Sequence, residues 1–281
     1  MPEIAYVNGE FMPLAEAVVS IEDRGFQFAD GVYEVIATYK SRPYAMEEHL
    51  QRLERSLKEL HIKLNIREYG LESLVDEGMR RSGFAESMIY IQITRGVAPR
   101  HHEFPAADVK PTVVMTIKEL QRLPDERYDK GVRVITAADL RWKRCDIKSV
   151  SLLANILAKQ QAKEAGAFEA FLFDEQGRIT EGASTSAFCI RAGTLWATPC
   201  GPHILPSITR GILLQLAQKI QLPIRQEFCS LEDYLRADEV FLAGTSAEAI
   251  GVVQIDDVII GDGAPGPITG RLRKAFLQTV E

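Results

Sequence analysis

The first part of the chain alternates between two spacings of apolar residues. Asn8 and Gly9 separate two short apolar runs, which predicts a β-hairpin with a type I′ turn because both residues tolerate a positive φ. Residues 47–60 carry leucines at positions 50, 53, 57 and 60, the spacing of an amphipathic helix. The same reasoning predicts a second helix over residues 71–81 and strands over residues 31–40, 88–95 and 112–117.

A polar, proline-containing stretch, residues 119–129, predicts a domain boundary. After it, a helix is predicted over residues 152–165, ending at Gly166, and another over residues 208–220, with Ser207 as its N-cap. Strands are predicted over residues 132–137, 170–174, 186–191, 194–197, 239–243 and 250–260, and a terminal helix over residues 269–280.

These elements interleave without a regular βαβ repeat, which predicts an α+β fold. With a length of 281 residues, the chain is long enough for two domains. We therefore expect a small N-terminal domain over residues 1–120 and a larger C-terminal domain over residues 121–281.

Composition narrows the class of protein. The 33 basic and 39 acidic residues give a net charge of −6, which disfavours nucleic-acid binding. The first ten residues lack the basic and apolar regions of a signal peptide, and no uncharged stretch reads as a membrane-spanning helix. The four cysteines form no CxxC pair and are typical of reduced thiols: Cys145, Cys189, Cys200 and Cys229. We expect a cytoplasmic protein that binds neither nucleic acid nor a membrane.

Two apparent motifs carry no function. Residues 261–266 match the spacing GxGxxG, but only fifteen residues follow Gly266, too few for the strand and acidic residue of a dinucleotide site. His101 and His102 are adjacent, so their side chains diverge on any regular element. We therefore expect neither a nicotinamide site nor a metal site.

The chemistry centres on residues 141–149, which are dense in charge yet lead directly into an apolar helix. Lys148 lies between Ile147 and Val150, close to the start of that helix. A solvated surface lysine is the ordinary interpretation. The alternative is an amine made nucleophilic by partial burial or a nearby positive charge. The pattern alone leaves both open.

A resemblance decides between them. Four segments, in this order and spacing, resemble the class IV, fold type IV family of pyridoxal-phosphate aminotransferases over almost the whole chain: residues 23–34, 144–149, 180–182 and 208–210. Residues 94–105 (TRGVAPRHHEFP) resemble the bacterial D-amino-acid subgroup of that family. Two positions depart from the pattern, Ser186 where asparagine is usual and Trp196 where a smaller aliphatic residue is usual.

The resemblance implies pyridoxal 5′-phosphate (PLP) as the cofactor. Lys148 would bond it covalently and then move the substrate proton, and Glu181 would bond the pyridine nitrogen. Without the resemblance, Glu181 reads as an exposed turn carboxylate. The phosphate would be held by Arg52, Ile208, Thr209 and Thr245. Arg52 otherwise reads as a solvated charge paired with Glu48 one helical turn earlier.

The resemblance also implies a substrate. Tyr33, Arg100 and His102 match the carboxylate-binding residues of the D-specific subgroup, in which the loop with the last two reaches in from the neighbouring subunit of a homodimer. It follows that the chain would transfer the amino group of a D-amino acid, such as D-alanine, to a 2-oxo acid, such as 2-oxoglutarate. The alternatives are a branched-chain L-aminotransferase, an aminodeoxychorismate-type lyase and a non-catalytic PLP carrier.

Overall fold

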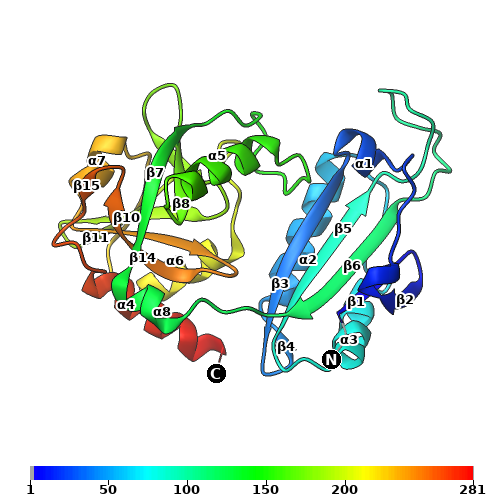
Figure 1. Ribbon diagram of the computed structural model, residues 1–281, viewed down its shortest axis with the longest axis horizontal. Helices are drawn as coiled ribbons and strands as arrows, with labels where there is room; N and C mark the ends of the chain where they lie inside the picture. The colour runs from blue at the N-terminus through cyan, green and yellow to red at the C-terminus, as the bar shows by residue number, and fades with distance from the viewer. Residues whose placement is uncertain (1–2, 281) are drawn as a thin grey trace. The chain divides into compact units, whose positions relative to one another are not determined.

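The computed structural model describes residues 3–280, which divide into two compact units (Figure 1). The first comprises the chain up to Gln121 together with Ile147–Ser151, and the second comprises Arg122–Asp146 and the chain from Leu152 onward. A single boundary near residue 120 does not describe this division, because the segment that carries Lys148 belongs with the first unit. Both units combine sheets with helices, which confirms the α+β fold.

The first unit contains a six-stranded antiparallel sheet with the strand order β2-β1-β6-β5-β3-β4. The predicted hairpin is confirmed, since Asn8 and Gly9 both have positive φ between paired strands. The strands are β1 (Ile4–Val7), β2 (Glu10–Pro13), β3 (Gly31–Tyr39), β4 (Arg42–Pro43), β5 (Ser87–Thr94) and β6 (Thr112–Glu119). The helices are η1 (Leu14–Glu16), α1 (Arg24–Phe28), α2 (Met46–Glu59) and α3 (Leu71–Ser82).

Helices α2 and α3 pack on this sheet because their apolar stripes match its inward-facing residues. Leu50, Leu53 and Leu57 of α2 are buried in one cluster with Val32 and Ile36 of β3. Burial of each leucine side chain stabilises the unit by about 1.5–3 kcal/mol. Side chains alternate along a strand, so the intervening residues of β3 point away from this cluster.

Ile147–Ser151 pairs with the start of β3. The Tyr33 amide donates a hydrogen bond to the Lys148 carbonyl (2.9 Å), and the Val150 amide donates to the Gly31 carbonyl (3.0 Å). Ile147 is buried in the core of the first unit. These contacts fix the backbone of Lys148 on β3.

The second unit contains a nine-stranded mixed sheet with the order β12-β11-β10-β13-β14-β7-β8-β9, with β15 paired to β14. The predicted strand over residues 250–260 is a hairpin, because the chain turns at Asp256, where φ is +48°. The strands are β7 (Val132–Ala138), β8 (Glu169–Phe173), β9 (Ile179–Gly182), β10 (Ser186–Arg191), β11 (Thr194–Ala197), β12 (Ile224–Gln226), β13 (Glu239–Gly244), β14 (Glu248–Ile255) and β15 (Val258–Ile259).

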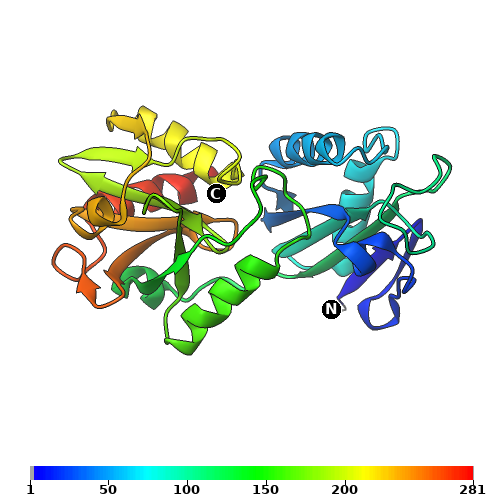
Figure 2. The same cartoon turned by 90° about the horizontal axis from the view of Figure 1, so that it is seen from above.

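Helices cover this sheet on more than one side. Figure 2 shows α5 along one side of the unit and α6 with α8 on another. The helices are α4 (Asp125–Lys130), α5 (Leu153–Glu164), α6 (Ile208–Lys219), α7 (Leu231–Leu235) and α8 (Pro267–Val280). The predicted N-cap of α6 is confirmed, since the Ser207 side chain accepts a hydrogen bond from the Arg210 amide. Among the helices of residues 3–280, none combines the length and apolar character needed to cross a bilayer.

Candidate active site

The Lys148 side chain lies over an aromatic ring of the first unit. Its Nζ is 4.1 Å from the centroid of the Tyr33 ring, and the Tyr33 and Tyr90 rings lie 5.6 Å apart. The Lys148 amide donates to the Ser56 hydroxyl on α2 (3.3 Å). Lys148 is half-buried, so a small molecule can still reach its amine. The structure therefore presents a backbone-anchored lysine next to a tyrosine.

Arg52 is buried, contrary to the interpretation of a solvated charge. It forms a bidentate pair with Glu34, through Nε at 2.7 Å and Nη2 at 2.8 Å, rather than the helical pair with Glu48 that the sequence suggested. Glu34 is 0% exposed and also bonds His49 Nδ1 at 2.7 Å. Burial acts to raise the pKa of Glu34, but Arg52 and His49 outweigh it and lower the pKa to about 2. Glu34 is therefore ionised and fixes the guanidinium of Arg52.

Arg52 and the Lys148 backbone meet the same helix. Ser56, which accepts the Lys148 amide bond, follows Arg52 by four residues and so lies about one turn, roughly 5.4 Å, along the same face of α2. A guanidinium carries five N–H donors, and the pair with Glu34 uses two of them. The arginine is therefore oriented by Glu34 and retains the chemistry to bind a phosphate.

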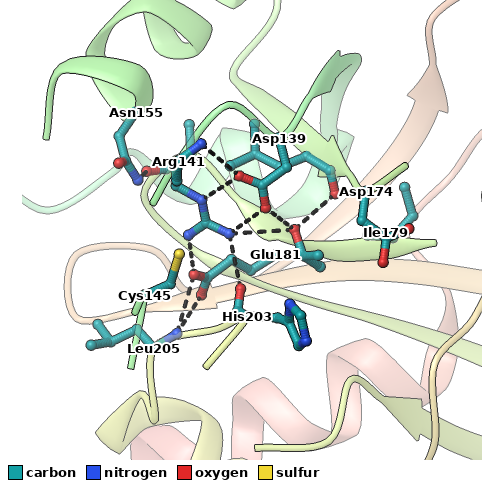
Figure 3. A network of polar contacts seen from close by, with 12 residues as sticks. Asp139, Arg141, Cys145, Asn155, Asp174, Ile179, Glu181, His203 and Leu205 are labelled. Atoms are coloured by element: carbon teal, nitrogen blue, oxygen red, sulfur yellow. Dashed lines mark hydrogen bonds and ion pairs between the residues drawn. The ribbon is translucent and has the colours of Figure 1, made fainter. Parts of the chain in front are cut away.

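Glu181 is buried on β9, contrary to the interpretation of an exposed turn carboxylate. It pairs with Arg141 and accepts hydrogen bonds from the Leu205 amide at 3.1 and 3.3 Å. Figure 3 shows the Arg141 guanidinium between Glu181 and Asp139, with its Nη2 also donating to the His203 carbonyl. Glu181 is thus held by a cation and a backbone amide.

The charges around Glu181 act in opposite directions. Burial raises the pKa of Glu181, while the charge and hydrogen bond of Arg141 and the Leu205 amide act against that rise. Asp139 holds Arg141 from the other side, and burial with Asp139 and Glu181 nearby raises the pKa of Cys145 to about 11. Cys145 is therefore a neutral thiol at pH 7 and offers no competing nucleophile.

The same contacts connect Glu181 to the start of α6. Leu205, which donates to Glu181, precedes Ile208 and Thr209 by only a few residues. The first amides of a helix have no intrahelical partner and favour an anion. Thr209 is buried at this helix start. The second unit therefore links a buried carboxylate with an anion-binding helix end.

Thr245 lies in the turn between β13 and β14. Gly244 precedes it and approaches Thr185, which follows Glu181 along the chain. The turn closes at Glu248, which has a φ of +52° and a carboxylate paired with Arg273 at 3.2 Å. A positive φ is uncommon for a residue with a side chain, so the ion pair helps to fix the turn.

Arg100 and His102 lie on an exposed loop of the first unit, beside Phe28 of α1. The Arg100 guanidinium is 4.8 Å from the centroid of the Phe28 ring, and the His102 ring is 5.6 Å from it. The structure thus brings two of the three predicted carboxylate-binding residues together at one ring. Tyr33, the third, lies with Lys148 on the same unit.

The two residues that depart from the family pattern both carry a buried polar atom. Ser186 Oγ and Trp196 Nε1 are buried without a hydrogen-bond partner among the described residues. Ser186 pairs with Ala243 at the end of β13, and Arg191 and Arg225 flank the Trp196 ring. Nothing in the structure explains why serine and tryptophan stand at these positions.

Glu34, His49, Arg141 and Asp139 were not predicted from the sequence. One signal for Glu34 was available, because strand alternation places it on the same face as Val32 and Ile36, where an unpaired charge is costly. Arg141 and Asp139 sit in a charged segment with no periodicity to distinguish them.

The donor set fits PLP. It offers an accessible amine, a buried carboxylate backed by an arginine, a buried arginine oriented by a carboxylate, and a helix start with free amides. These groups match an aldehyde, a ring nitrogen and a phosphate in turn. They come from both compact units.

Comparison with known proteins gives the class of this chain. The family model "Amino-transferase class IV" matches residues 31–255, so the chain belongs to the class IV aminotransferases. It is therefore a PLP-dependent enzyme whose substrates are amino acids and 2-oxo acids. The resemblance seen in the sequence and the expected cofactor are confirmed.

Similar proteins narrow the comparison. The chain is 39% identical over 280 residues to the D-alanine aminotransferase of Staphylococcus haemolyticus, covering 98% of this chain and 97% of the relative. It is 42% identical over 277 residues to that of Bacillus licheniformis, covering 97% and 95%.

A similar solved structure is a branched-chain amino acid aminotransferase (from T.th.) with pyridoxamine 5′-phosphate, with a TM-score of 0.90 and 29% identity over 100% of this chain and 94% of that one. Another is the Escherichia coli branched-chain enzyme, with a TM-score of 0.87 and 26% identity over 99% and 94%. The fold type IV architecture is thereby confirmed.

Proposed function

We propose that this chain transfers the amino group of a D-amino acid, such as D-alanine, to a 2-oxo acid, such as 2-oxoglutarate. The observation that carries the proposal is the pairing of Arg100 and His102 around Phe28 on an exposed loop. A guanidinium can bond a substrate carboxylate bidentately, and a histidine adds a ring N–H. The D-alanine aminotransferases at 39% and 42% identity support the same reaction.

The residues of both units would share the work. When bound, PLP supplies the aldehyde that takes the amino group and the ring that accepts the electrons left at Cα. Lys148 would bond the cofactor and then, as a free amine, carry the proton from Cα. Glu181 would hold a proton at the ring nitrogen, kept in place by Arg141.

Four residues would fix the cofactor phosphate. Arg52, oriented by Glu34, supplies a cation, and the amides of Ile208 and Thr209 lie at the start of α6. Thr245 adds a hydroxyl from its turn. We propose the same cofactor-binding role for these four residues as their resemblance to the family implies.

The position of the carboxylate would set the chirality. Lys148 serves one face of the cofactor, so it can take a proton only from a Cα–H that points to that face. With the amine fixed, exchanging the carboxylate and the side chain inverts the enantiomer whose hydrogen meets the lysine. Tyr33, Arg100 and His102 would hold the carboxylate in the D-specific position.

A branched-chain L-aminotransferase is the second candidate. The solved branched-chain enzymes have TM-scores of 0.90 and 0.87 to this chain. Their identity of 29% and 26% is lower than the 42% to a D-alanine aminotransferase, and a shared fold does not fix the substrate. We therefore place the D-specific reaction first.

The Arg100→Ala variant tests this function. Losing a desolvated, charge-assisted contact costs about 1.5–3 kcal/mol, so kcat/KM for D-alanine should fall roughly tenfold to over a hundredfold. A carboxylate-free amine, such as (R)-1-phenylethylamine, should be affected much less. Arg81→Ala is the control, because Arg81 also lies over a phenylalanine ring, that of Phe11 on the same unit. Unchanged D-alanine kinetics in Arg100→Ala would contradict the proposed function.

We also propose that the enzyme is a homodimer with shared sites. Leu153, Ile156 and Leu157 follow the three-and-four spacing on α5 and are 70%, 59% and 55% exposed, and such an exposed apolar stripe is typical of an interface. A reducing cytoplasm suits the four free thiols, and we propose that location.

Mixed subunits test the sharing of sites. Lys148→Ala and Arg100→Ala should each be impaired with D-alanine, but a mixture should recover activity. If Arg100 serves the partner's site, one site of each hybrid dimer combines an intact lysine with an intact arginine. Homodimers of each variant, subjected to the same unfolding and refolding, are the controls. Subunit exchange without recovery would assign both residues to one chain.

A further inference from the structure

The loop that carries Arg100 and His102 is attached to the chain around α1. The Arg24 amide donates to the Gly96 carbonyl at 2.9 Å, and the Ala98 amide donates to the Glu22 carbonyl at 3.3 Å. Beyond Ala98 the loop has no helix or strand through Lys110, and its residues from Pro99 to Phe104 are exposed. Its conformation therefore depends on contacts made by side chains.

Arg24 makes the most direct of these contacts. The residue is 4% exposed, and its Nη1 and Nη2 donate to the carbonyls of His101 at 2.6 Å and His102 at 3.4 Å. These partners are 77 and 78 positions further along the chain. One buried guanidinium therefore binds the backbone on which the two carboxylate-binding side chains are mounted.

Asp30 holds this guanidinium and a second one. It accepts from Arg24 Nε at 2.8 Å and from Arg95 at 2.7 and 2.9 Å. The two arginines lower the pKa of Asp30, so the carboxylate is charged at neutral pH. Arg95 also donates to the Leu60 carbonyl at the end of α2, and its guanidinium lies 3.7 Å from the centroid of the Phe104 ring.

Phe28 supplies the surface on which the side chains gather. Arg24 lies 4.9 Å from the centroid of its ring and Arg100 lies 4.8 Å from it. The His102 ring lies 5.6 Å away. A cation over an aromatic face gains about 0.5–2 kcal/mol, which favours one placement of an otherwise exposed arginine.

We propose that Arg24, Asp30 and Phe28 form a brace that positions Arg100 and His102 to bind the substrate carboxylate. The inference rests on the proposed function, because it assigns a task to the residues that hold Arg100 and His102. Arg24 and Phe28 are positioning residues: they act through the loop and touch neither cofactor nor reacting atoms. A change in them should alter recognition of the carboxylate and leave the chemistry at Lys148 intact.

The test compares Arg24→Met with wild type as PLP-loaded enzymes. Methionine keeps much of the volume of arginine but cannot donate to the His101 and His102 carbonyls. Trypsin should cleave the Arg100–His101 bond at least about tenfold faster, because the loop loses its two backbone anchors. KM for D-alanine should rise about tenfold, whereas kcat, the visible spectrum and the kinetics with (R)-1-phenylethylamine should change less than about twofold.

Two further variants make the test decisive. Phe28→Leu keeps an apolar side chain but removes the ring, and it should raise KM for D-alanine several-fold even if Arg24→Met folds poorly. Arg81→Met is the matched control, because Arg81 also lies over a phenylalanine ring, at 4.7 Å, but on α3. It should leave both cleavage and KM unchanged.

Three results would contradict the brace. One is unchanged cleavage and unchanged KM in Arg24→Met and Phe28→Leu. Another is faster cleavage with unchanged KM, since the loop conformation would then not matter to the substrate. The third is an equal loss with D-alanine and the carboxylate-free amine, which indicates general damage. Failure of the proposed function is separate, because it appears as unchanged D-alanine kinetics in Arg100→Ala.

Discussion

Lys148→Ala is expected to reduce transamination by about 10²–10⁴-fold or more, the largest effect of any single substitution in this chain. The variant loses both the amine that bonds the cofactor and the base that carries the Cα proton. Lys148 is suited to these roles because its backbone is fixed on β3 and α2 while its amine, over the Tyr33 ring, is half-buried. PLP can still be retained through its phosphate.

The measurement is chemical as well as kinetic. Borohydride reduction should fix the cofactor to wild type at Lys148, as a peptide map shows, and the variant should release its cofactor on denaturation after the same treatment. Lys143→Ala is the control, because this exposed lysine lies five positions earlier in the same charged segment. Cofactor fixed to the Lys148→Ala chain would remove Lys148 from its role.

Glu181→Gln should give the second largest effect, a loss in kcat of roughly tenfold to over a hundredfold, because hydrogen bonds to charged groups contribute about 1.5–3 kcal/mol. An amide cannot hold a proton at the pyridine nitrogen, so the ring becomes a weaker electron acceptor. The variant also removes one of the two carboxylates that flank Arg141, leaving Asp139.

The change should appear in kcat more than in KM for D-alanine, since Glu181 would contact the cofactor and not the substrate carboxylate. Deuterium at Cα should slow the variant more than the wild type if proton transfer has become rate-limiting. Glu175→Gln is the control, because Glu175 is an exposed carboxylate in the turn before β9. A full wild-type kcat in Glu181→Gln would contradict the assignment.

Elements with a strong local pattern were predictable from the sequence. The leucine stripe of α2, the Asn8-Gly9 turn and the Ser207 cap are decided by neighbours in the chain, and all three are confirmed. The short helix α1 was missed, because five residues cannot display a helical period.

The site shows a sharper limit. A resemblance could nominate Lys148 and Glu181, but no local pattern reveals that Glu34 binds Arg52 or that Arg24 binds the carbonyls of residues 101 and 102. Those contacts join positions up to 78 residues apart. They exist only because the sheet brings the segments together, so neither spacing nor composition can encode a visible signal for them.

The most direct test of the account is the enantiomer that the wild-type enzyme accepts in a single half-reaction. Purified PLP enzyme is mixed rapidly with D-alanine, L-leucine or L-glutamate in the absence of a 2-oxo acid, and the decay of the visible absorption of the lysine-bound cofactor is followed. The account predicts that D-alanine bleaches this band at a rate roughly a hundredfold or more above either L-amino acid. Faster bleaching by L-leucine or L-glutamate would contradict it and favour the branched-chain reaction.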